Sequence, residues 1–375
     1  MGEAVEQVSV HKSPLDERHK AAGAQMSERD GWSVPASYGD ESGEYQAVRD
    51  GGGAGLIDLS SRALVEVSGT EAVPFLNGLI TNDVKALEDG AWMLAAFPNV
   101  QGRLIATARV LRRRADAFLF DTEAATREPV FKTLERFTLA GDFRVRDLTD
   151  ETAVLSVQGA RAVEVIGATL GEEAAQVKRG RVHSAQWEKR SVSLIRATHT
   201  GEDGFDLFLG AGQAPSLWDA LASAGARPVG FNALETLRIE AGLPRYGVDM
   251  DEANVVLETG LDEAVSYTKG CYVGQEIIAR IHWRGHVAKR LAGLSFDDEA
   301  QALRGDKIRA ADGREIGRVT SSAFSPRRNR AIALAYVKYD YLAPGTEVQV
   351  ISDNGERAAR VDELPLVRGG WYEAE

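Results

Sequence analysis

The residue types best suited to chemistry gather around Cys271, the single cysteine of the chain. Glycines on both sides of it predict a tight loop, and the apolar spacing that follows predicts a helix from Gln275 to Trp283. A helix N-terminus and a nearby ammonium group both lower the pKa of a thiol, so Cys271 and Lys269 are candidate catalytic residues. A free cysteine can equally be a small buried apolar residue. The candidate motif comprises Lys269, Gly270, Cys271, Tyr272, Gly274, Gln275, Glu276 and Arg280.

A metal site is a weaker interpretation of the same region. His282 and His286 are four residues apart, but Gly285 interrupts the helix that would place both imidazoles on one face. A lone cysteine also excludes an intramolecular disulfide and an iron–sulfur cluster held by this chain alone. We therefore predict no metal site held by this chain alone. If iron–sulfur chemistry is involved, the protein assists it or shares a cluster with thiols of other proteins.

A second candidate site lies between two predicted strands, from Thr200 to Asp206. Its glycines and acidic residues are typical of a polar hairpin. Alternatively, the carboxylate of Asp206 could accept two parallel hydrogen bonds from a planar ring with an amino-pyrimidinone edge. The residues alone leave both interpretations open.

A third candidate site follows a helix predicted from Asn232 to Ala241. Glu235 and Arg238 are spaced for an i,i+3 ion pair, which we expect on a solvated face. Tyr246 comes after the glycine and proline that end the helix. Its ring could stack on a ligand or cap the core.

The elements that must position these residues divide the chain into three parts. Residues 1–45 carry nine acidic and four basic residues with few aliphatic ones, which predicts a disordered acidic tail. Residues 46–290 alternate strand-like runs with amphipathic helices and divide near residue 150. Residues 291–368 contain almost only strand signals and tight turns, which predicts a β-barrel. Because no regular βαβ alternation is present, the expected fold class is α+β.

The overall charge and hydropathy exclude several classes of protein. Lys and Arg number 44 against 56 Asp and Glu in 375 residues, and the net charge of −12 argues against direct binding of nucleic acid. The longest apolar run, from Ala331 to Val337, is too short to cross a bilayer, and the first residues lack a secretion signal. We therefore expect a cytoplasmic protein that binds neither nucleic acid nor membranes.

Taken together and in this order, these segments resemble the folate-binding proteins related to the glycine-cleavage T protein, which is an aminomethyltransferase. The likeness runs from about Gly55 to Val367. It also takes in the segments Leu79–Asp83 and Gly317–Ser321. More narrowly, the motif around Cys271 looks like the signature of the YgfZ subgroup of that family.

The resemblance implies a three-domain ring of the aminomethyltransferase type, with a central funnel that holds tetrahydrofolate or a derivative. It also implies a role in the assembly or repair of iron–sulfur enzymes, including enzymes that modify transfer RNA. Partners would then be a reduced folate and iron–sulfur proteins or carriers. On this basis Lys269 or an arginine would meet the glutamate tail of the folate. The folate-binding candidates are Asp206, Tyr246, Tyr272, Arg238, Asn82 and Asp83.

The chain departs from the transferase at the position of the catalytic aspartate. The resemblance aligns that aspartate with Ala106 or Thr107, and neither residue has a carboxylate. The acid expected to grip the pterin is the shorter Asp206 rather than a glutamate, and Leu234 replaces an expected arginine. Because a general acid or base is missing, we expect that the protein is not a glycine-cleavage aminomethyltransferase.

The leading hypothesis is a tetrahydrofolate-binding protein that assists iron–sulfur cluster assembly, with Cys271 and Lys269 as a reactive lip of the funnel. One alternative is a folate-dependent one-carbon transferase or demethylase that uses another acid, such as Asp83 or Asp206. The other alternative is a non-catalytic assembly scaffold that has kept the fold.

Overall fold

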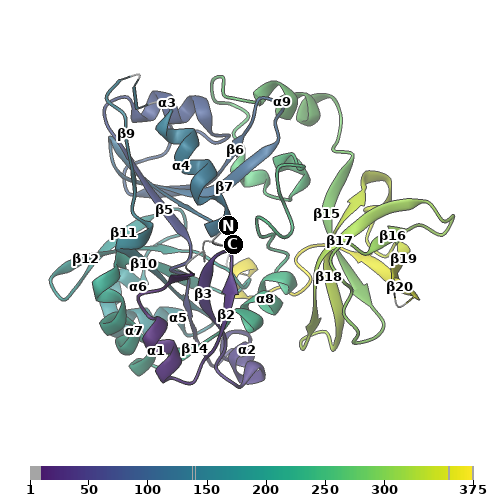
Figure 1. Ribbon diagram of the computed structural model, residues 1–375, viewed down its shortest axis with the longest axis horizontal. Helices are drawn as coiled ribbons and strands as arrows, with labels where there is room; N and C mark the ends of the chain where they lie inside the picture. Colours follow the sequence, from purple (N-terminus) through teal and green to yellow (C-terminus); the bar gives the residue numbers. More distant parts are fainter. Residues whose placement is uncertain (1–9, 137, 140, 354, 374–375) are drawn as a thin grey trace, which may run out of the picture.

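The computed structural model describes residues 10–373 except 137, 140 and 354, and it has two sheet-containing lobes beside a barrel (Figure 1). The first lobe is a five-stranded sheet in the order β6-β7-β8-β5-β9. Helices α3 and α4 cover it, and Leu76 and Leu134 from these helices join Phe97 and Phe120 from the strands in one buried cluster. The elements are β5 (Ala63–Ser68), α3 (Ala72–Leu79), β6 (Ala91–Pro98), β7 (Leu104–Arg114), β8 (Ala117–Thr122), α4 (Arg127–Glu135) and β9 (Arg144–Asp147).

The second lobe is a six-stranded sheet in the order β11-β12-β13-β10-β4-β14. Its outer face packs on helices, with Ile166 and Leu217 buried against Leu155 and Phe205. The elements are β4 (Gly55–Asp58), β10 (Thr152–Gln158), α5 (Ala162–Leu170), α6 (Glu172–Ala175), β11 (Val182–Trp187), β12 (Arg190–Arg196), β13 (Gly204–Gly210), α7 (Ala214–Ser223) and β14 (Arg227–Pro228).

A third hydrophobic cluster joins the inner faces of the two sheets. Leu111 and Leu119 of the first sheet meet Val154 and Phe208 of the second, and Leu237 closes the cluster from α8 (Phe231–Glu240). The alternation of side chains along each strand sends one set outward to the helices and the other inward to this seam. The seam brings the two lobes together and therefore fixes what lies between them.

The prediction of a disordered tail over residues 1–45 is wrong for residues 10–45, while residues 1–9 lie outside the described residues. The segment folds into a three-stranded sheet, order β1-β3-β2, with two helices. The composition suggested disorder because it does not reveal the buried polar pairs that stabilise this segment together with its apolar contacts. His19 is 1% exposed, with its Nε2 2.9 Å from Asp58 Oδ2 and its Nδ1 2.8 Å from the Tyr38 hydroxyl. The elements are β1 (His11–Lys12), α1 (Asp16–Ala21), β2 (Gln25–Arg29), β3 (Trp32–Ser37) and α2 (Glu41–Arg49).

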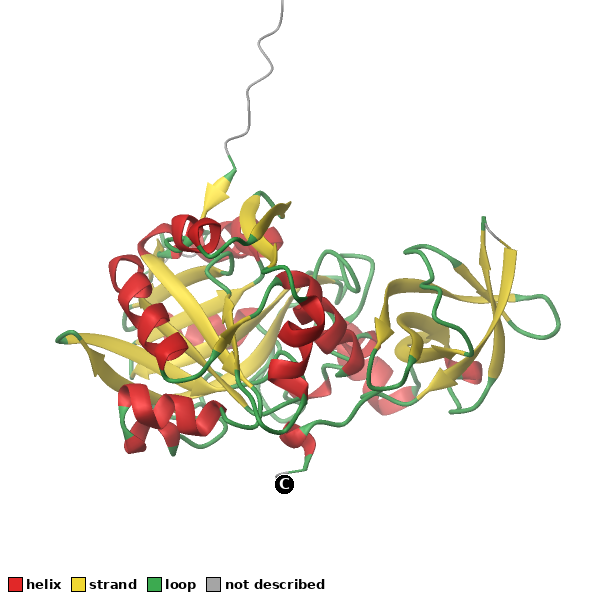
Figure 2. Ribbon diagram, turned by 90° about the horizontal axis from the view of Figure 1, so that it is seen from below, coloured by secondary structure: helices red, strands yellow, loops and turns green. Residues whose placement is uncertain are grey.

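The C-terminal part is a closed six-stranded barrel, order β15-β18-β17-β16-β19-β20, which confirms the barrel expected there (Figures 1 and 2). Small side chains fill its narrow interior, among them Ala331, Ala333 and Ala335 on alternate positions of one strand. The strands are β15 (Lys289–Phe296), β16 (Lys307–Arg309), β17 (Glu315–Ser325), β18 (Arg330–Lys338), β19 (Glu347–Ser352) and β20 (Gly355–Asp362).

A long connection links α8 to the barrel and carries the cysteine motif. It contains α9 (Gln275–Arg284), close to the helix predicted from Gln275 to Trp283. The remaining short 3₁₀ turns are η1 (Ala124–Thr126), η2 (Thr149–Glu151), η3 (Ala211–Gln213), η4 (Val256–Glu258), η5 (Asp262–Ala264), η6 (Tyr339–Tyr341) and η7 (Gly370–Tyr372). Within the described residues, no helix is long and apolar enough to span a bilayer.

A buried ion pair fastens the N-terminal segment to α8 and to the barrel. Glu240 is 0% exposed and accepts hydrogen bonds from Arg49 at 2.8 Å, from the Tyr45 hydroxyl at 2.9 Å and from Ser325 of β17. Arg49 also binds Glu202 at 2.7 Å. The carboxylate therefore holds three parts of the chain at one point.

Replacing Glu240 with Gln should lower the free energy of unfolding by about 3 kcal/mol, because it leaves a buried guanidinium with one charged partner fewer. Chemical denaturation followed by tryptophan fluorescence measures the change. Glu347→Gln is the matched control, since Glu347 is 81% exposed and 3.8 Å from Arg360. Equal stability of the Glu240 variant and the control would contradict a fastening role.

Candidate functional site

A central cavity of about 390 Å³ lies where the two lobes meet the connection to the barrel. Both lobes contribute side chains, including Trp92 and Thr107 from the first and His199 from the second. Leu243 and Met250 line it from the connection, and the C-terminal segment adds Trp371 and Tyr372. A smaller cavity of about 100 Å³ continues from it and shares Arg62, Glu123, His199, Leu243 and Pro244. The site is thus built from distant parts of the sequence.

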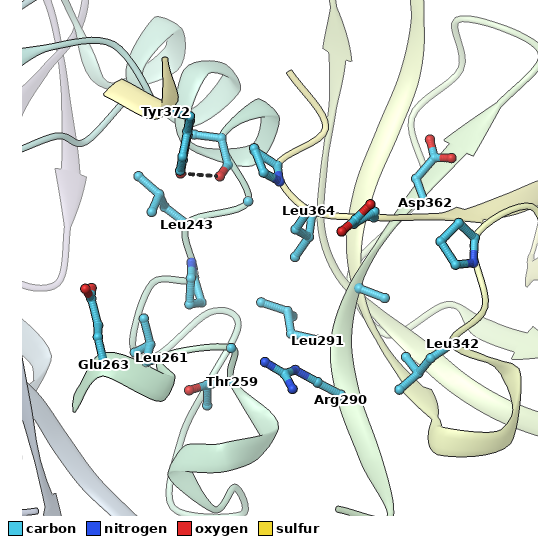
Figure 3. A pocket seen from close by; sticks show the side chains of 18 residues that line it. Leu243, Thr259, Leu261, Glu263, Arg290, Leu291, Leu342, Asp362, Leu364 and Tyr372 are labelled. Carbon is cyan, nitrogen blue, oxygen red and sulfur yellow. Dashed lines mark hydrogen bonds between the residues drawn. The ribbon is translucent and has the colours of Figure 1, made fainter. Parts of the chain in front are cut away.

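A larger cavity of about 630 Å³ lies beside it, between the connection and the barrel (Figure 3). The two cavities share Leu243, Pro244, Leu261, Glu263 and Tyr372, so these residues stand at their common border. We name the two spaces the central cavity and the interdomain cavity.

A network of buried charges forms one wall of the central cavity. Arg109 on β7 faces Asp121 directly across the β7–β8 pair, and its Nε is 2.6 Å from Asp121 Oδ2. Its guanidinium also binds Asp206 on β13 of the other lobe. Arg62 completes the network with 2.6 Å contacts to Asp121 and Glu123. Local sequence patterns do not predict this network, because Arg109 and Asp121 meet only through the strand register and Arg62 reaches Asp121 from outside the strands.

Asp206, the predicted acceptor of a ring edge, lies behind this wall. It is 0% exposed, and Oδ2 is engaged by Arg109 and by His199 Nε2 at 2.7 Å. Burial alone would raise the pKa of Asp206, but the charges of His199 and Arg109 outweigh it and hold the pKa well below its usual range. Asp206 therefore influences the cavity through Arg109 and His199, which are the residues that line it.

The predicted i,i+3 ion pair of Arg238 with Glu235 is present, but Arg238 is buried rather than solvated. It is 6% exposed, binds Glu235, and donates to Asp249 Oδ2 at 2.6 Å. Asp249 in turn accepts 2.6 and 2.7 Å hydrogen bonds from Thr320 and Ser321 of the barrel. Arg238 also lines the smaller cavity, so it links α8, the barrel and the site.

The two positions aligned with the catalytic aspartate of the transferase face opposite ways. Ala106 is 0% exposed in the core of the first lobe, whereas Thr107 lines the central cavity. The residue of this pair that reaches the cavity therefore offers a hydroxyl and no carboxylate.

The loop around Cys271 is fixed by its glycine and lysine. Gly274 caps α9 with φ +75°, and a Cβ there would sit 2.5 Å from the carbonyl of Asn99, so only glycine fits. Lys269 is 8% exposed, and its ammonium donates to the carbonyls of Ile80 at 2.8 Å and Asn82 at 2.7 Å. Burial lowers the pKa of Lys269 to about 8. Lys269 is therefore a tether between two loops, which corrects its predicted role as a free cation for a folate tail.

The other predicted site residues hold loops in place. Asn82 donates to the carbonyls of Leu94 and Glu263 at 2.8 and 2.9 Å, and Asp83 caps the turn that follows. Tyr246 donates to the Leu104 carbonyl at 3.2 Å and packs in a cluster with Tyr272. The Tyr272 ring lies 5.0 Å from the Lys269 ammonium. None of these side chains lines the central cavity.

The remaining motif residues lie on the surface. Arg280 and Glu276 form an exposed pair at 2.7 Å one helical turn apart on α9, and Cys271 is an exposed free thiol. Among the described residues, no group of three or more His, Cys, Asp or Glu side chains is placed to hold a metal ion.

The C-terminal segment returns from the barrel to the site. Trp371 N donates to the Gly201 carbonyl at 3.1 Å, Gly370 N donates to Glu202 at 2.7 Å, and the Tyr372 hydroxyl donates to the Ala241 carbonyl at 3.2 Å. Arg179 stacks on the Trp371 ring with its guanidinium carbon 3.8 Å from the ring centre. These contacts hold two aromatic residues at the cavity wall.

Lys269→Met should lower the free energy of unfolding by about 1–3 kcal/mol, because two buried carbonyls lose their donor. The same change should leave the reaction rate of Cys271 with an aromatic disulfide within twofold, since the ammonium is directed at those carbonyls. Lys132→Met, at a site 64% exposed, is the control. A large fall in the rate of thiol reaction would instead show that Lys269 activates the cysteine.

Comparison with known proteins agrees with this architecture. Residues 15–269 match the model of the GCVT N-terminal domain, and residues 289–367 match that of the glycine cleavage T-protein C-terminal barrel domain. The chain is 35% identical to an aminomethyltransferase of Rubrobacter xylanophilus, over 97% of this chain and 96% of the other. An aminomethyltransferase of Saccharopolyspora erythraea is 32% identical, over 96% and 99%.

A solved structure of the same kind aligns over almost the whole length. It is the glycine cleavage system aminomethyltransferase T of Bartonella henselae, with a TM-score of 0.88, 27% identity, and coverage of 96% of this chain and 99% of that one. The N-terminal segment from residue 15 is part of the matched domain, in agreement with its folded structure here. The chain therefore belongs to the glycine-cleavage T-protein family and has the aminomethyltransferase-type fold.

Proposed function

We propose that the protein binds a reduced folate in the central cavity and uses it in the transfer of a one-carbon unit. The observation that carries the proposal is the cavity itself, which lies where the two lobes, the connection to the barrel and the C-terminal segment meet. The full-length match to relatives named aminomethyltransferase favours a transferase over a scaffold without a ligand.

The chemistry of the walls suits a folate. Trp92 and Trp371 offer flat apolar faces for its rings. In the part of the chain that the structure describes, Trp92 Nε1 and Arg238 Nε are buried donors without an acceptor. A pterin ring carries carbonyl and ring-nitrogen acceptors, so it could satisfy such donors, which otherwise cost free energy. When bound, the folate supplies a secondary amine that takes up the one-carbon unit.

The reaction we propose differs from glycine cleavage in its proton-transfer group. The cavity position aligned with the catalytic aspartate is Thr107, whose hydroxyl is a poor base at neutral pH. A folate-dependent transferase or demethylase acting on another donor fits this wall better than the glycine-cleavage step itself. We place this activity in the cytoplasm.

Removing the Trp371 ring tests the folate site directly. Trp371→Ala should weaken the binding of tetrahydrofolate at least tenfold in anaerobic titration calorimetry, because a ring-stacking face is lost. Trp283→Ala is the matched control, since that indole is 70% exposed on α9 and lines no part of the central cavity. Absence of folate binding by a well-folded wild-type sample would refute the proposed function.

A second candidate function is the YgfZ-type role in iron–sulfur cluster assembly or repair. The observation that favours it is the exposed thiol of Cys271, on a loop fixed by the buried Lys269 ammonium and a glycine cap. An exposed thiol held in a fixed loop can meet a carrier protein, and the partner would supply the other cluster ligands.

A rescue experiment separates this second candidate from the first. In a bacterial strain that lacks its own protein of this kind, Cys271→Ala should restore iron–sulfur enzyme activity less well than the wild type, while it binds tetrahydrofolate equally. Cys271→Ser serves as the isosteric comparison. Full rescue by Cys271→Ala would remove the thiol from the function.

A further inference from the structure

The carboxylates around the central cavity differ in one property, which is whether a cation is paired with them. Glu123 binds Arg62 at 2.6 Å, and Glu235 binds Arg238. Burial alone would raise the pKa of Glu123 and of Glu235, but these arginines outweigh it and lower both values. Paired carboxylates of this kind stay ionised and are poor proton donors.

Among the described residues, Glu263 is the exception among the carboxylates that line the central cavity and the smaller cavity that continues from it. It stands on η5 at the border of the central and interdomain cavities. In Figure 3 its side chain extends from that turn, on the side of the view opposite the barrel strands. Within the described residues, the carboxylate of Glu263 has no ion pair and no side-chain hydrogen bond. The nearby protein reduces its hydration and raises its pKa, although the residue stays accessible.

The backbone that carries Glu263 is held in place from the first lobe. Asn82 donates to the Glu263 carbonyl at 2.9 Å, and Thr81 donates to the Ala264 carbonyl at 2.6 Å. Asp262, the neighbour of Glu263, is bound by Arg290 of β15. These contacts fix the backbone of the turn on both sides, so the position from which the Glu263 side chain extends is set before any ligand arrives.

Resting on the proposed function, we propose that Glu263 is the proton-transferring residue of the site for an amine donor. The donor has the form R₂N–CH₂Y, where each R is carbon or hydrogen and Y is hydrogen or hydroxyl. Its C–N bond breaks with the electron pair moving to nitrogen, which takes a proton from the Glu263 carboxyl and leaves as R₂NH. A secondary amine of a bound folate would form the new C–N bond and return its proton to Glu263. Where Y is hydroxyl, the transferred hydroxymethyl group would then lose water as a second folate amine closes the methylene bridge. Atoms and charge balance, and no oxidant is needed.

The charges that surround Glu263 are compatible with this role. Tyr372 faces it from the C-terminal segment, where burial raises the pKa of the phenol and the charge of Glu263 raises it further. Across the central cavity stand His199 and the Arg62–Glu123 pair, while Arg290 is already bound to Asp262. A neutral amine donor entering between them would find Glu263 as the carboxyl group without a cation of its own, which can hold the proton that the leaving nitrogen takes.

The test compares Glu263→Gln, Glu263→Asp and the control Glu363→Gln, which removes a carboxylate from the barrel side of the interdomain cavity. Trimethylamine and N-hydroxymethylglycine are the donors, and mass spectrometry measures methyl- or methylene-tetrahydrofolate. Calorimetry measures tetrahydrofolate binding separately. Glu263→Gln should bind tetrahydrofolate with an affinity within twofold of the wild type but lose about 10²–10⁴-fold in kcat. Glu263→Asp should recover part of the lost kcat. Glu363→Gln should match the wild type in both quantities.

The pH profile gives a second readout. The wild-type rate should fall as pH rises through the pKa of Glu263, because the carboxyl loses the proton it gives to the leaving nitrogen, and this limb should vanish in Glu263→Gln. Equal turnover by Glu263→Gln and the wild type would overturn the inference. So would a wild type that binds folate but turns over neither amine, whereas a wild type that fails to bind folate would refute the proposed function itself.

Discussion

The site depends on the bond between Arg109 and two carboxylates from different lobes. Asp121 and Asp206 are both 0% exposed, and burying either charge without a partner would cost several kcal/mol. Because Arg109 reaches both, the two sheets can approach closely enough to share the hydrophobic seam of Leu111, Val154 and Phe208. The wall of the central cavity is the exposed side of this same network.

Ion pairing with arginine also separates the carboxylates around the cavity into two groups. The carboxylates bound by Arg62, Arg109 or Arg238 support the cavity walls, and these arginines keep them ionised. A fold with the hydroxyl of Thr107, and no carboxylate, at this part of the wall still needs a proton carrier if it performs transfer chemistry. Glu263 has the two properties that the paired groups lack, which are an accessible position and a raised pKa. The segment Thr81–Asn82, which resembles the family, holds η5 through hydrogen bonds to the carbonyls of Ala264 and Glu263.

The sequence predicted the features that depend on local patterns. Turn signals and strand runs identified the barrel, and helical spacing after Gly274 identified α9. It missed features that depend on partners far along the chain. The polar pairs of His19 with Asp58 fold a segment whose composition is typical of disorder. The contact of Arg109 with Asp121 follows only from strand register, and Lys269 could be recognised as a tether only once the carbonyls of Ile80 and Asn82 were placed beside it. Spacing identified the residues of the motif but not the directions of their side chains.

The C-terminal segment adds the last part of the site, since Trp371 and Tyr372 arrive there from the barrel. The most direct measurement of the central claim is a co-crystal structure of the full chain with tetrahydrofolate, grown without oxygen. Our account predicts density for the pterin ring in the central cavity, between Trp92 and Trp371 and within reach of Glu263. A structure with the folate bound elsewhere, or with an unchanged empty cavity at saturating folate, would contradict it.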